Sequence, residues 1–236
     1  LSHAKIDASV LGSAKARVES QSRAVLEAAE RAAVSALRTE LHAGTPLAVP
    51  LVLPVAEAKA ITVPLLERFY RERYVAENLT IMIAGDLDAE EAVQKVASAF
   101  QDIPRGRESS RPKFSQRSGS GLRAIPLRNQ EGTVGTAIAI GFRAPAWGTA
   151  DALALDVLMA LLVDSPTSRT QRRLNTGNAE FLHASAMRQL ETDGGTITLA
   201  FSVHPDSLQE AEGGLLATIE QARSTPIPSE DFEMAV

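Results

Sequence analysis

The pattern of apolar residues divides the first hundred residues into helices and extended segments. Residues 13–42 contain neither glycine nor proline, and their apolar positions recur every three or four residues, which predicts a helix interrupted near residues 20–22. Gly44 and the three prolines that follow it predict an extended loop or sheet edge. A second helix is predicted from Thr62 as its N-cap, because Pro64 then falls in the first turn, where a missing N–H costs nothing.

The stretch LTIMIAGDLDAEEAVQKVASAF, residues 79–100, predicts a strand that leads directly into a helix. Gly85 lets the strand turn, and Asp86 or Asp88 can cap the helix. Such a Gly-Asp junction is either a catalytic corner or a structural turn. We interpret it as structural, because capping and the two glutamates at the positive end of the helix dipole already explain its acidic residues.

The second half of the chain predicts a strand, a buried helix, a hairpin and two further helices, in that order. These elements are expected at residues 133–145, 149–163, 179–203, 205–224 and 226–236, with a short polar helix at 165–174. A strand, a helix and then an Ile-Pro pair occur in both halves, as DIP in the first and PIP in the second. This weak repeat indicates two domains built from similar units.

Residues 105–128 differ in composition from both halves. They carry seven basic residues against one acid, with serine, glycine and proline throughout. This composition predicts a solvated linker. The alternative, a nucleic-acid contact, would need interleaved aromatic residues, and the whole chain has a net charge of −5. The predicted domains are therefore residues 1–104 and 129–236.

Composition sets limits on what the chain can be. Its 236 residues, 44% hydrophobic and 22% charged, suffice for one large or two smaller globular domains. No apolar run approaches the roughly 20 residues of a membrane span, and the negative charge argues against a nucleic-acid partner. The absence of cysteine excludes disulfides, thiolate zinc sites and cysteine nucleophiles, and it leaves the cellular compartment open.

Few residues offer chemistry. The four histidines are His3, His42, His183 and His204, and none has a second histidine within a helical turn, as a zinc hydrolase would require. The linker segment SGSGL follows no predicted strand, so it does not fit the turn that holds a serine nucleophile. It also lacks the G-K-[ST] ending of a phosphate-binding loop. Glu90 and Glu91 are explained by the helix dipole. The residues alone thus identify no catalytic, metal or substrate-binding site.

The order of segments is more informative. The sequence ITVPLLERFYRERYVAENLTIMIAGDLDAEEAVQKVASAFQDIPRG resembles the insulinase/pitrilysin family of zinc peptidases, which includes the mitochondrial processing peptidases, at Phe69, Tyr70, Tyr74, Asn78, Gly85, Asp86, Glu90, Glu91, Ile103 and Pro104. Upstream, GTPLAVPLV is similar to the His-Pro-Tyr segment of the family, with Thr45 in place of the histidine. Downstream, Ser168 and Arg169 match its Ser-Ser-Arg-Leu helix, and STPIPSEDFEMA resembles its next Pro-Ser-Glu stretch. The resemblance covers nearly the whole chain.

The resemblance implies an α+β fold with two related metallopeptidase-like domains. Each would have a mixed, largely antiparallel sheet with helices packed on one face. Residues 1–104 would form the C-terminal part of the first domain, and residues 129–236 most of a second, non-catalytic domain. Because Leu1 stands where a Met is usual and the last helix has no stop signal, we expect both ends to lie within a longer protein.

The departures from the family concern its active site. The H-x-x-E-H motif, which supplies two zinc ligands and a general base, is absent, and we expect it upstream of Leu1. The third ligand, a glutamate, would align at Ser20, with Glu19 one residue away, or at Leu37. Neither alignment places a glutamate. The Arg and Tyr that hold the substrate backbone in some members would align near Asn175 and Leu182, and are also missing.

The resemblance therefore implies a bacterial metalloendopeptidase that hydrolyses peptide bonds with zinc-activated water in the full-length or partnered enzyme. This chain would form a non-catalytic wall of the peptide chamber, with no metal or catalytic residue of its own. Its partners would be an unfolded peptide and a second peptidase-like half or subunit, in the periplasm or the cytoplasm. One alternative is an inactive interaction or structural subunit that keeps the fold. Another is an unrelated α/β domain with chance similarity.

Overall fold

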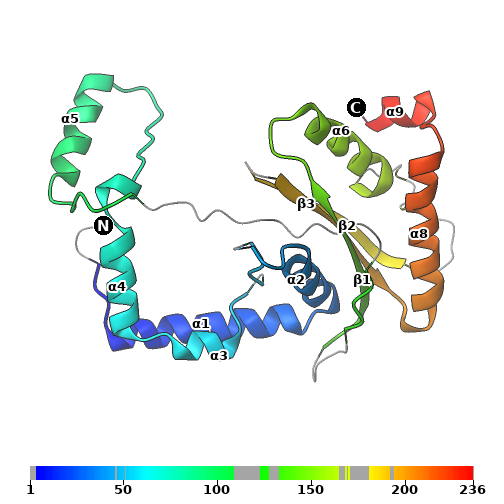
Figure 1. Ribbon diagram of the computed structural model, residues 1–236, viewed down its shortest axis with the longest axis horizontal. Coiled ribbons are helices and arrows are strands. Elements are labelled where there is room, and N and C mark those ends of the chain that lie inside the picture. The colour runs from blue at the N-terminus through cyan, green and yellow to red at the C-terminus, as the bar shows by residue number, and fades with distance from the viewer. Residues whose placement is uncertain are drawn as a thin grey trace. The chain divides into compact units, whose positions relative to one another are not determined.

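Contacts between residues divide the chain into two compact units, drawn from a computed structural model in Figure 1. The first unit comprises Leu1–Ser20 and Pro54–Lys113, and the second comprises Gln21–Leu53 and Phe114–Val236. The structure describes residues 4–45, 47–50, 52–108, 123–127, 133–164, 168, 170, 181–191 and 194–235. Residues 21–53 thus belong with the C-terminal part of the chain, although most of their sequence neighbours belong to the first unit.

The elements of the first unit are helical where the structure describes them. They are the start of α1 (Ala8–Leu26), α3 (Val55–Ala60), α4 (Val63–Arg73), the short 3-10 helix η1 (Ala76–Asn78) and α5 (Ala89–Phe100). Both predicted caps are confirmed. The Thr62 side chain accepts a hydrogen bond from the Leu65 N–H at the start of α4, and Asp88 Oδ1 accepts one from the Glu91 N–H at 2.9 Å.

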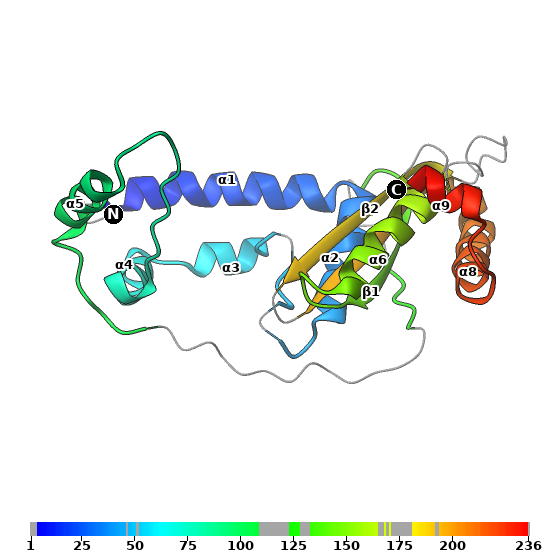
Figure 2. The same ribbon diagram turned by 90° about the horizontal axis from the view of Figure 1, so that it is seen from above.

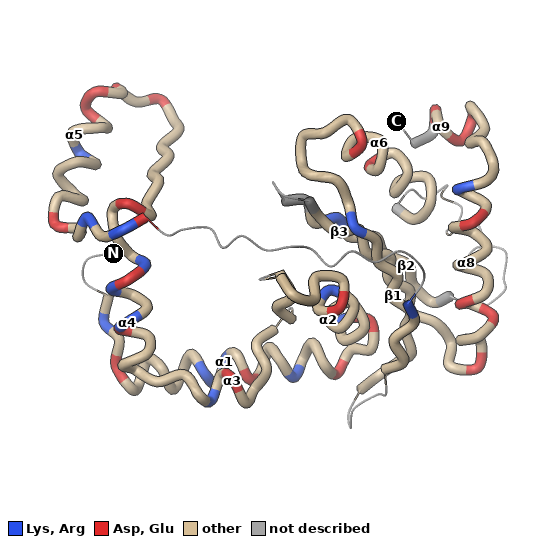
Figure 3. The backbone as a smooth tube through the Cα atoms, in the orientation of Figure 1, with Lys and Arg blue, Asp and Glu red and all other residues tan. Residues whose placement is uncertain are grey.

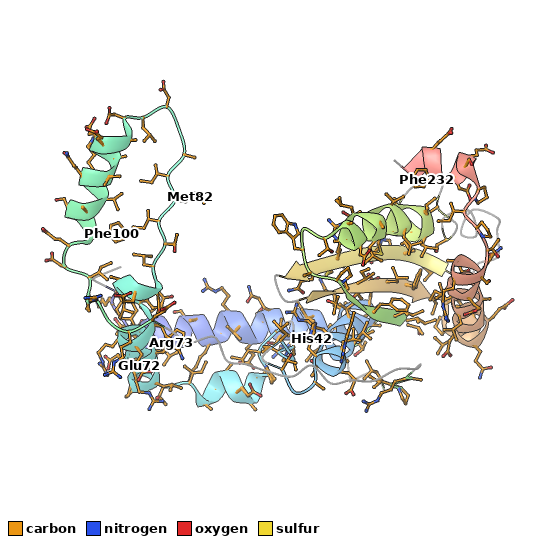
Figure 4. The ribbon with its side chains drawn as sticks, turned by 45° about the horizontal axis from the view of Figure 1, so that its top comes forward. His42, Glu72, Arg73, Met82, Phe100 and Phe232 are labelled. Atoms are coloured by element: carbon orange, nitrogen blue, oxygen red, sulfur yellow. The ribbon has the colours of Figure 1, made fainter. Side chains whose placement is uncertain are left out.

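The strand expected at residues 79–84 is not formed in the described part of the chain. The segment is extended but pairs with no other strand there. The side chains of Ile81, Met82 and Ile83 are 40%, 90% and 52% exposed. Figure 4 labels Met82 on this segment, opposite α5. The prediction was wrong because apolar, β-branched residues favour a strand only when a neighbouring strand satisfies the backbone.

The long N-terminal helix is broken, but not at residues 20–22 as predicted. It continues to Leu26, and α2 (Ala29–Leu41) begins after Ala28, whose backbone is extended. The Ala29 N–H donates to the Val134 carbonyl at 3.2 Å, and the Val134 N–H donates to the Glu27 carbonyl at 2.7 Å. The helix thus ends where the chain pairs with a residue more than one hundred positions away, a contact that the local sequence does not predict.

The second unit contains a three-stranded antiparallel sheet with the strand order β1-β3-β2. Its strands are β1 (Thr136–Ala144), β2 (Phe181–Glu191) and β3 (Gly194–Val203). The register places Ile140 opposite Leu199, and Leu199 opposite Ala186. The predicted strand at 133–145 and the predicted hairpin at 179–203 are confirmed. The polar helix predicted at 165–174 lies outside the described residues, apart from Ser168 and Thr170.

One face of this sheet carries the hydrophobic core. Helix α6 (Ala150–Met159), the π-helical turn η2 (Ala160–Asp164) and α8 (Leu208–Ser224), which follows the 3-10 helix η3 (Pro205–Ser207), cover this face, and α9 (Ser229–Ala235) follows. The buried residues of this core are Ala144, Met159, Leu162, Val163, Ile197, Leu199, Phe201, Val203, Ala211 and Leu215. Alternate residues of β3 point into the core, as period-two patterning requires.

The other face of the sheet is covered by α2, which Figures 1 and 2 show beside β1. Along each strand, the residues of this face alternate with the core residues of the opposite face, and they are mostly small or polar. They include Gly141, Thr198, Ala200 and Ser202. Helices therefore pack on both faces, where the sequence predicted one. The α+β class is confirmed. The described strands are all antiparallel and form one sheet, where a mixed sheet in each of two domains was predicted.

Candidate functional site

The three described histidines lie apart in the sequence and on different elements. His42 is buried directly after α2, His183 lies on β2, and His204 precedes η3. Figure 4 labels His42 in the second unit. His3 lies outside the described residues. Within the described ranges, no group of three or more His, Asp or Glu side chains could hold a metal ion. The donor set present there does not fit a zinc site.

The acidic residues of the Gly-Asp junction lie at the start of α5, on the surface of the first unit. Glu90 and Glu91 fall in its first turn, and Glu91 pairs with Lys95 at 2.6 Å, one helical turn further on. Gly85 has a φ of +158°, which is close to extended backbone. A Cβ there would meet only Leu87 Cδ2 at 3.5 Å, an ordinary contact. These positions fit the structural interpretation of the junction.

The positions aligned with the family's third zinc ligand lie on two helices. Glu19 and Ser20 are on α1, and Leu37 is on α2, where its side chain packs close to Gly141 of β1. Thr45, aligned with the family histidine, is buried, and its hydroxyl donates to the His42 carbonyl at 2.8 Å. This hydrogen bond stabilises the turn that follows α2.

Of the two positions aligned with substrate-binding residues, Asn175 lies outside the described residues and Leu182 on β2 is exposed. Of the two residues that match the Ser-Ser-Arg-Leu helix, Arg169 also lies outside the described residues. Ser168 is buried, and its hydroxyl donates to the Val163 carbonyl at 3.0 Å. That bond satisfies a carbonyl of η2, so Ser168 helps to end the helical segment.

A polar cluster that sequence reasoning missed connects α2 to the sheet. Glu30, in the first turn of α2, accepts hydrogen bonds from the hydroxyls of Ser185 on β2, at 3.0 Å, and Ser202 on β3, at 2.8 Å. His183 Nδ1 lies 3.5 Å from the Glu30 Oε2 atom. Arg38, two turns further along α2, donates to the Gln189 side-chain amide of β2. The cluster joins residues that are more than 150 positions apart.

This polar cluster stabilises the fold better than it supports catalysis. The two serine hydroxyls share one carboxylate, each donating to a different oxygen, so that Glu30 joins α2 to both β2 and β3. Each oxygen of Glu30 therefore has a hydroxyl donor, so the part-buried carboxylate is compensated. The only signal in the sequence was the alternation of polar residues along the hairpin, which predicts a polar sheet face but not its partner.

Surface charge and hydropathy add two observations. Figure 3 shows acidic and basic residues interleaved along α4 rather than gathered by sign. Among the helices that the structure describes, none combines the length and the apolar character needed to cross a membrane.

Comparison with known proteins identifies relatives of the chain. Its residues 60–236 match the family model described as the Peptidase M16 inactive domain. The chain is 24% identical over 168 residues to the probable zinc protease PqqL of Escherichia coli (strain K12), a match that covers 68% of this chain and 18% of that protein. The chain therefore spans less than a fifth of the length of this relative.

Two solved structures share the fold. A protease from Helicobacter pylori superposes with a TM-score of 0.78 at 14% identity, over 98% of this chain and 57% of that one. A chain of Complex III2 from Candida albicans gives a TM-score of 0.70 at 16% identity, over 94% of this chain and 54% of that one. At these identities the likeness concerns the fold, while the family model covers three quarters of the sequence. The chain belongs to the Peptidase M16 inactive domain family, within the pitrilysin-type zinc proteases.

Proposed function

We propose that this chain forms a non-catalytic wall of the peptide chamber of an M16 metalloendopeptidase. One observation carries the proposal: residues 60–236 match the family model described as the Peptidase M16 inactive domain. Hydrolysis of peptide bonds by zinc-activated water would take place in the full-length or partnered enzyme. No step of that chemistry is assigned to a residue of this chain.

The proposal includes the two-domain arrangement, with residues 1–104 as the C-terminal part of a first domain, 105–128 as a linker and 129–236 as most of a second; residues 21–53 of the first part pack within the second unit. In the described part of the first unit, Ala58 and Val75 are the only buried apolar residues. The apolar side chains of residues 81–83 and of Val93 in α5 are exposed. An extended segment and a helix with exposed apolar side chains need strands beside them to cover those side chains. Remaining strands of a first domain would supply that cover.

The proposed partners are an unfolded peptide and a second peptidase-like half or subunit. The resemblance to PqqL, of which the chain covers 18%, supports additional halves within one protein. The resemblance to a chain of Complex III2 supports assembly with other subunits. The second resemblance also favours the alternative, a subunit that keeps the fold for assembly and takes no part in hydrolysis.

Metal analysis and two assays test the proposal. We expect the purified chain, after incubation with zinc and dialysis, to retain no stoichiometric zinc and to show no chelator-sensitive hydrolysis of denatured, fluorescently labelled casein. One equivalent of bound zinc would contradict a non-catalytic role. Fluorescence anisotropy with a labelled, unfolded casein peptide then separates the two functions. Saturable binding supports a chamber wall, whereas its absence supports the structural subunit.

A further inference from the structure

The face of the sheet opposite the hydrophobic core has the shape and the polar groups to receive a helix from the N-terminal part of the chain. We propose that this helix-docking face is an interface that holds residues 1–113 and 114–236 together even when the chain between them is cut. The helix-docking face is defined by Ala137, Ala139, Gly141, His183, Ser185, Gln189, Thr196, Thr198, Ala200 and Ser202. Its occupant is α2, residues 29–41. This inference does not depend on the proposed function.

Shape complementarity begins at Gly141. An added Cβ there would lie 2.6 Å from Leu41 Cδ1 and 2.8 Å from Leu37 Cδ2. A side chain at this position would force both leucines to move, whereas glycine leaves room for them as they lie. Val34 and Ser35, on the same helix, are buried. The helix therefore packs with its apolar side directly against the backbone of β1.

Polar contacts fix the register of the helix on this face. The two oxygens of Glu30 accept from Ser185 and Ser202, which lie on different strands, so the carboxylate bridges β2 and β3. Arg38 donates to Gln189 near the other end of α2. A helix shifted by one residue would lose these bonds and leave part-buried polar groups without partners. Such groups cost more when unpaired than they gain when paired, which makes the docking specific.

Backbone and linker contacts add to the interface on both ends of α2. The bridge between Ala28 and Val134 hydrogen-bonds the chain just before α2 to the segment just before β1. The Thr133 hydroxyl donates to the Leu26 carbonyl at 3.2 Å. Near the other end of the helix, Arg123 pairs with Glu40. Apart from the Arg123 pair, which lies in the predicted linker, these apolar, polar and main-chain contacts connect residues before 54 to residues after 128.

The helix that fits this face is amphipathic. It has the acid Glu30 in its first turn, leucines at positions 37 and 41, and Arg38 directly after the first leucine. The chain supplies this helix itself. Two copies could also exchange it, because a helix that docks without covalent help can dock on a second sheet of the same kind.

Cutting the full chain tests the interface. A protease recognition sequence is inserted between Lys113 and Phe114 of the complete chain, which is purified intact and then cleaved. Size-exclusion chromatography and native mass spectrometry follow the fragments. We expect both fragments to elute together, at the mass of the uncut chain or of an exchanged dimer. Separation of the fragments without denaturant would overturn the proposal.

Two variants test where the interface lies, and a third serves as the control. Glu30→Ala and Gly141→Val should each weaken the association of the cut fragments about tenfold or more, which is the factor for 1.4 kcal/mol. Glu27→Ala, an exposed acid just before α2, should leave the association unchanged. Circular dichroism of each uncut variant confirms that it is folded before cleavage. If the fragments stay together equally well in Glu30→Ala and Gly141→Val, the interface lies elsewhere and the proposal fails.

Discussion

Gly141 on β1 and Leu41 on α2 approach so closely that a Cβ on the glycine would lie 2.6 Å from the leucine Cδ1 atom. The first prediction follows from this contact. Gly141→Val should lower the free energy of unfolding by about 1–3 kcal/mol, because an over-packed site forces α2 away from the sheet. Urea unfolding of the whole chain, followed by circular dichroism, measures the change.

A glycine in open surroundings provides the matched control. A Cβ on Gly213, in α8, would meet no heavy atom within 4 Å. Gly213→Ala should therefore raise the free energy of unfolding by about 0.5–1 kcal/mol, since alanine loses less conformational entropy in a helix. Equal effects of the two substitutions would show that the contact with α2 is not what makes Gly141 necessary.

The second prediction concerns the hydrogen bond between Glu30 and Ser202, 2.8 Å long. A double-mutant cycle with Glu30→Ala and Ser202→Ala should give a coupling energy of about 0.5–3 kcal/mol, as directly contacting residues do. Urea unfolding of the four proteins provides the energies. The same cycle with Glu27 in place of Glu30 should give additive effects, and a coupling near zero for the Glu30 pair would contradict the described geometry.

The third prediction concerns the first unit, where Gly106 has a φ of +69° and a Cβ added to it would lie 2.3 Å from Val75 Cβ. Gly106→Ala should destabilise this region by about 1–3 kcal/mol, because both backbone strain and a steric clash oppose the change. Val75 is buried, and the neighbouring Ala76 N–H donates to the Pro104 carbonyl at 2.9 Å. Hydrogen exchange measured by mass spectrometry should therefore become faster at Ala76.

The control for this measurement is Gly12→Ala in α1, where a Cβ meets nothing within 4 Å. Exchange at Ala76 should be unchanged in that variant. Faster exchange in both variants would mean that the amide reports general instability rather than the contact with Gly106.

The fourth prediction compares two acids of one helix. Asp88→Ala should destabilise α5 by about 1 kcal/mol, because the Asp88 carboxylate caps the Glu91 N–H. Glu90→Ala removes only a favourable charge near the helix dipole, worth about 0.3–1 kcal/mol at low salt. Hydrogen exchange in residues 89–92 distinguishes the two effects, and a larger effect of Glu90→Ala would refute the capping assignment.

Features set by neighbouring residues could be predicted from the sequence. Thr62 was identified as a cap, and Asp88 as one of two alternatives with Asp86, because a cap depends on the two or three residues that follow it. The hairpin of β2 and β3 was predicted because its apolar alternation and its turn lie within one short stretch. The α+β class was implied by the resemblance to the insulinase/pitrilysin family rather than by these local patterns.

Features set by distant residues could not be predicted. The end of α1 depends on pairing with Val134, and nothing near Ala28 marks it. Ser185 and Ser202 donate hydrogen bonds to Glu30, a partner that can be identified only once the fold is known. The residues aligned with the family's zinc ligands were placed by resemblance, and they lie on α1 and α2 without forming a metal-binding group within the described ranges.

The extended segment at residues 79–84 has a practical consequence for handling the protein. A run of exposed Ile, Met and Ile that pairs with no strand in the described part of the chain is a template for pairing between molecules, and it carries no charge or proline to prevent this. At high concentration the purified chain would therefore tend to form intermolecular β-structure through this run. A lysine at Met82, the most exposed of the three side chains, is the simplest way to keep the protein in solution.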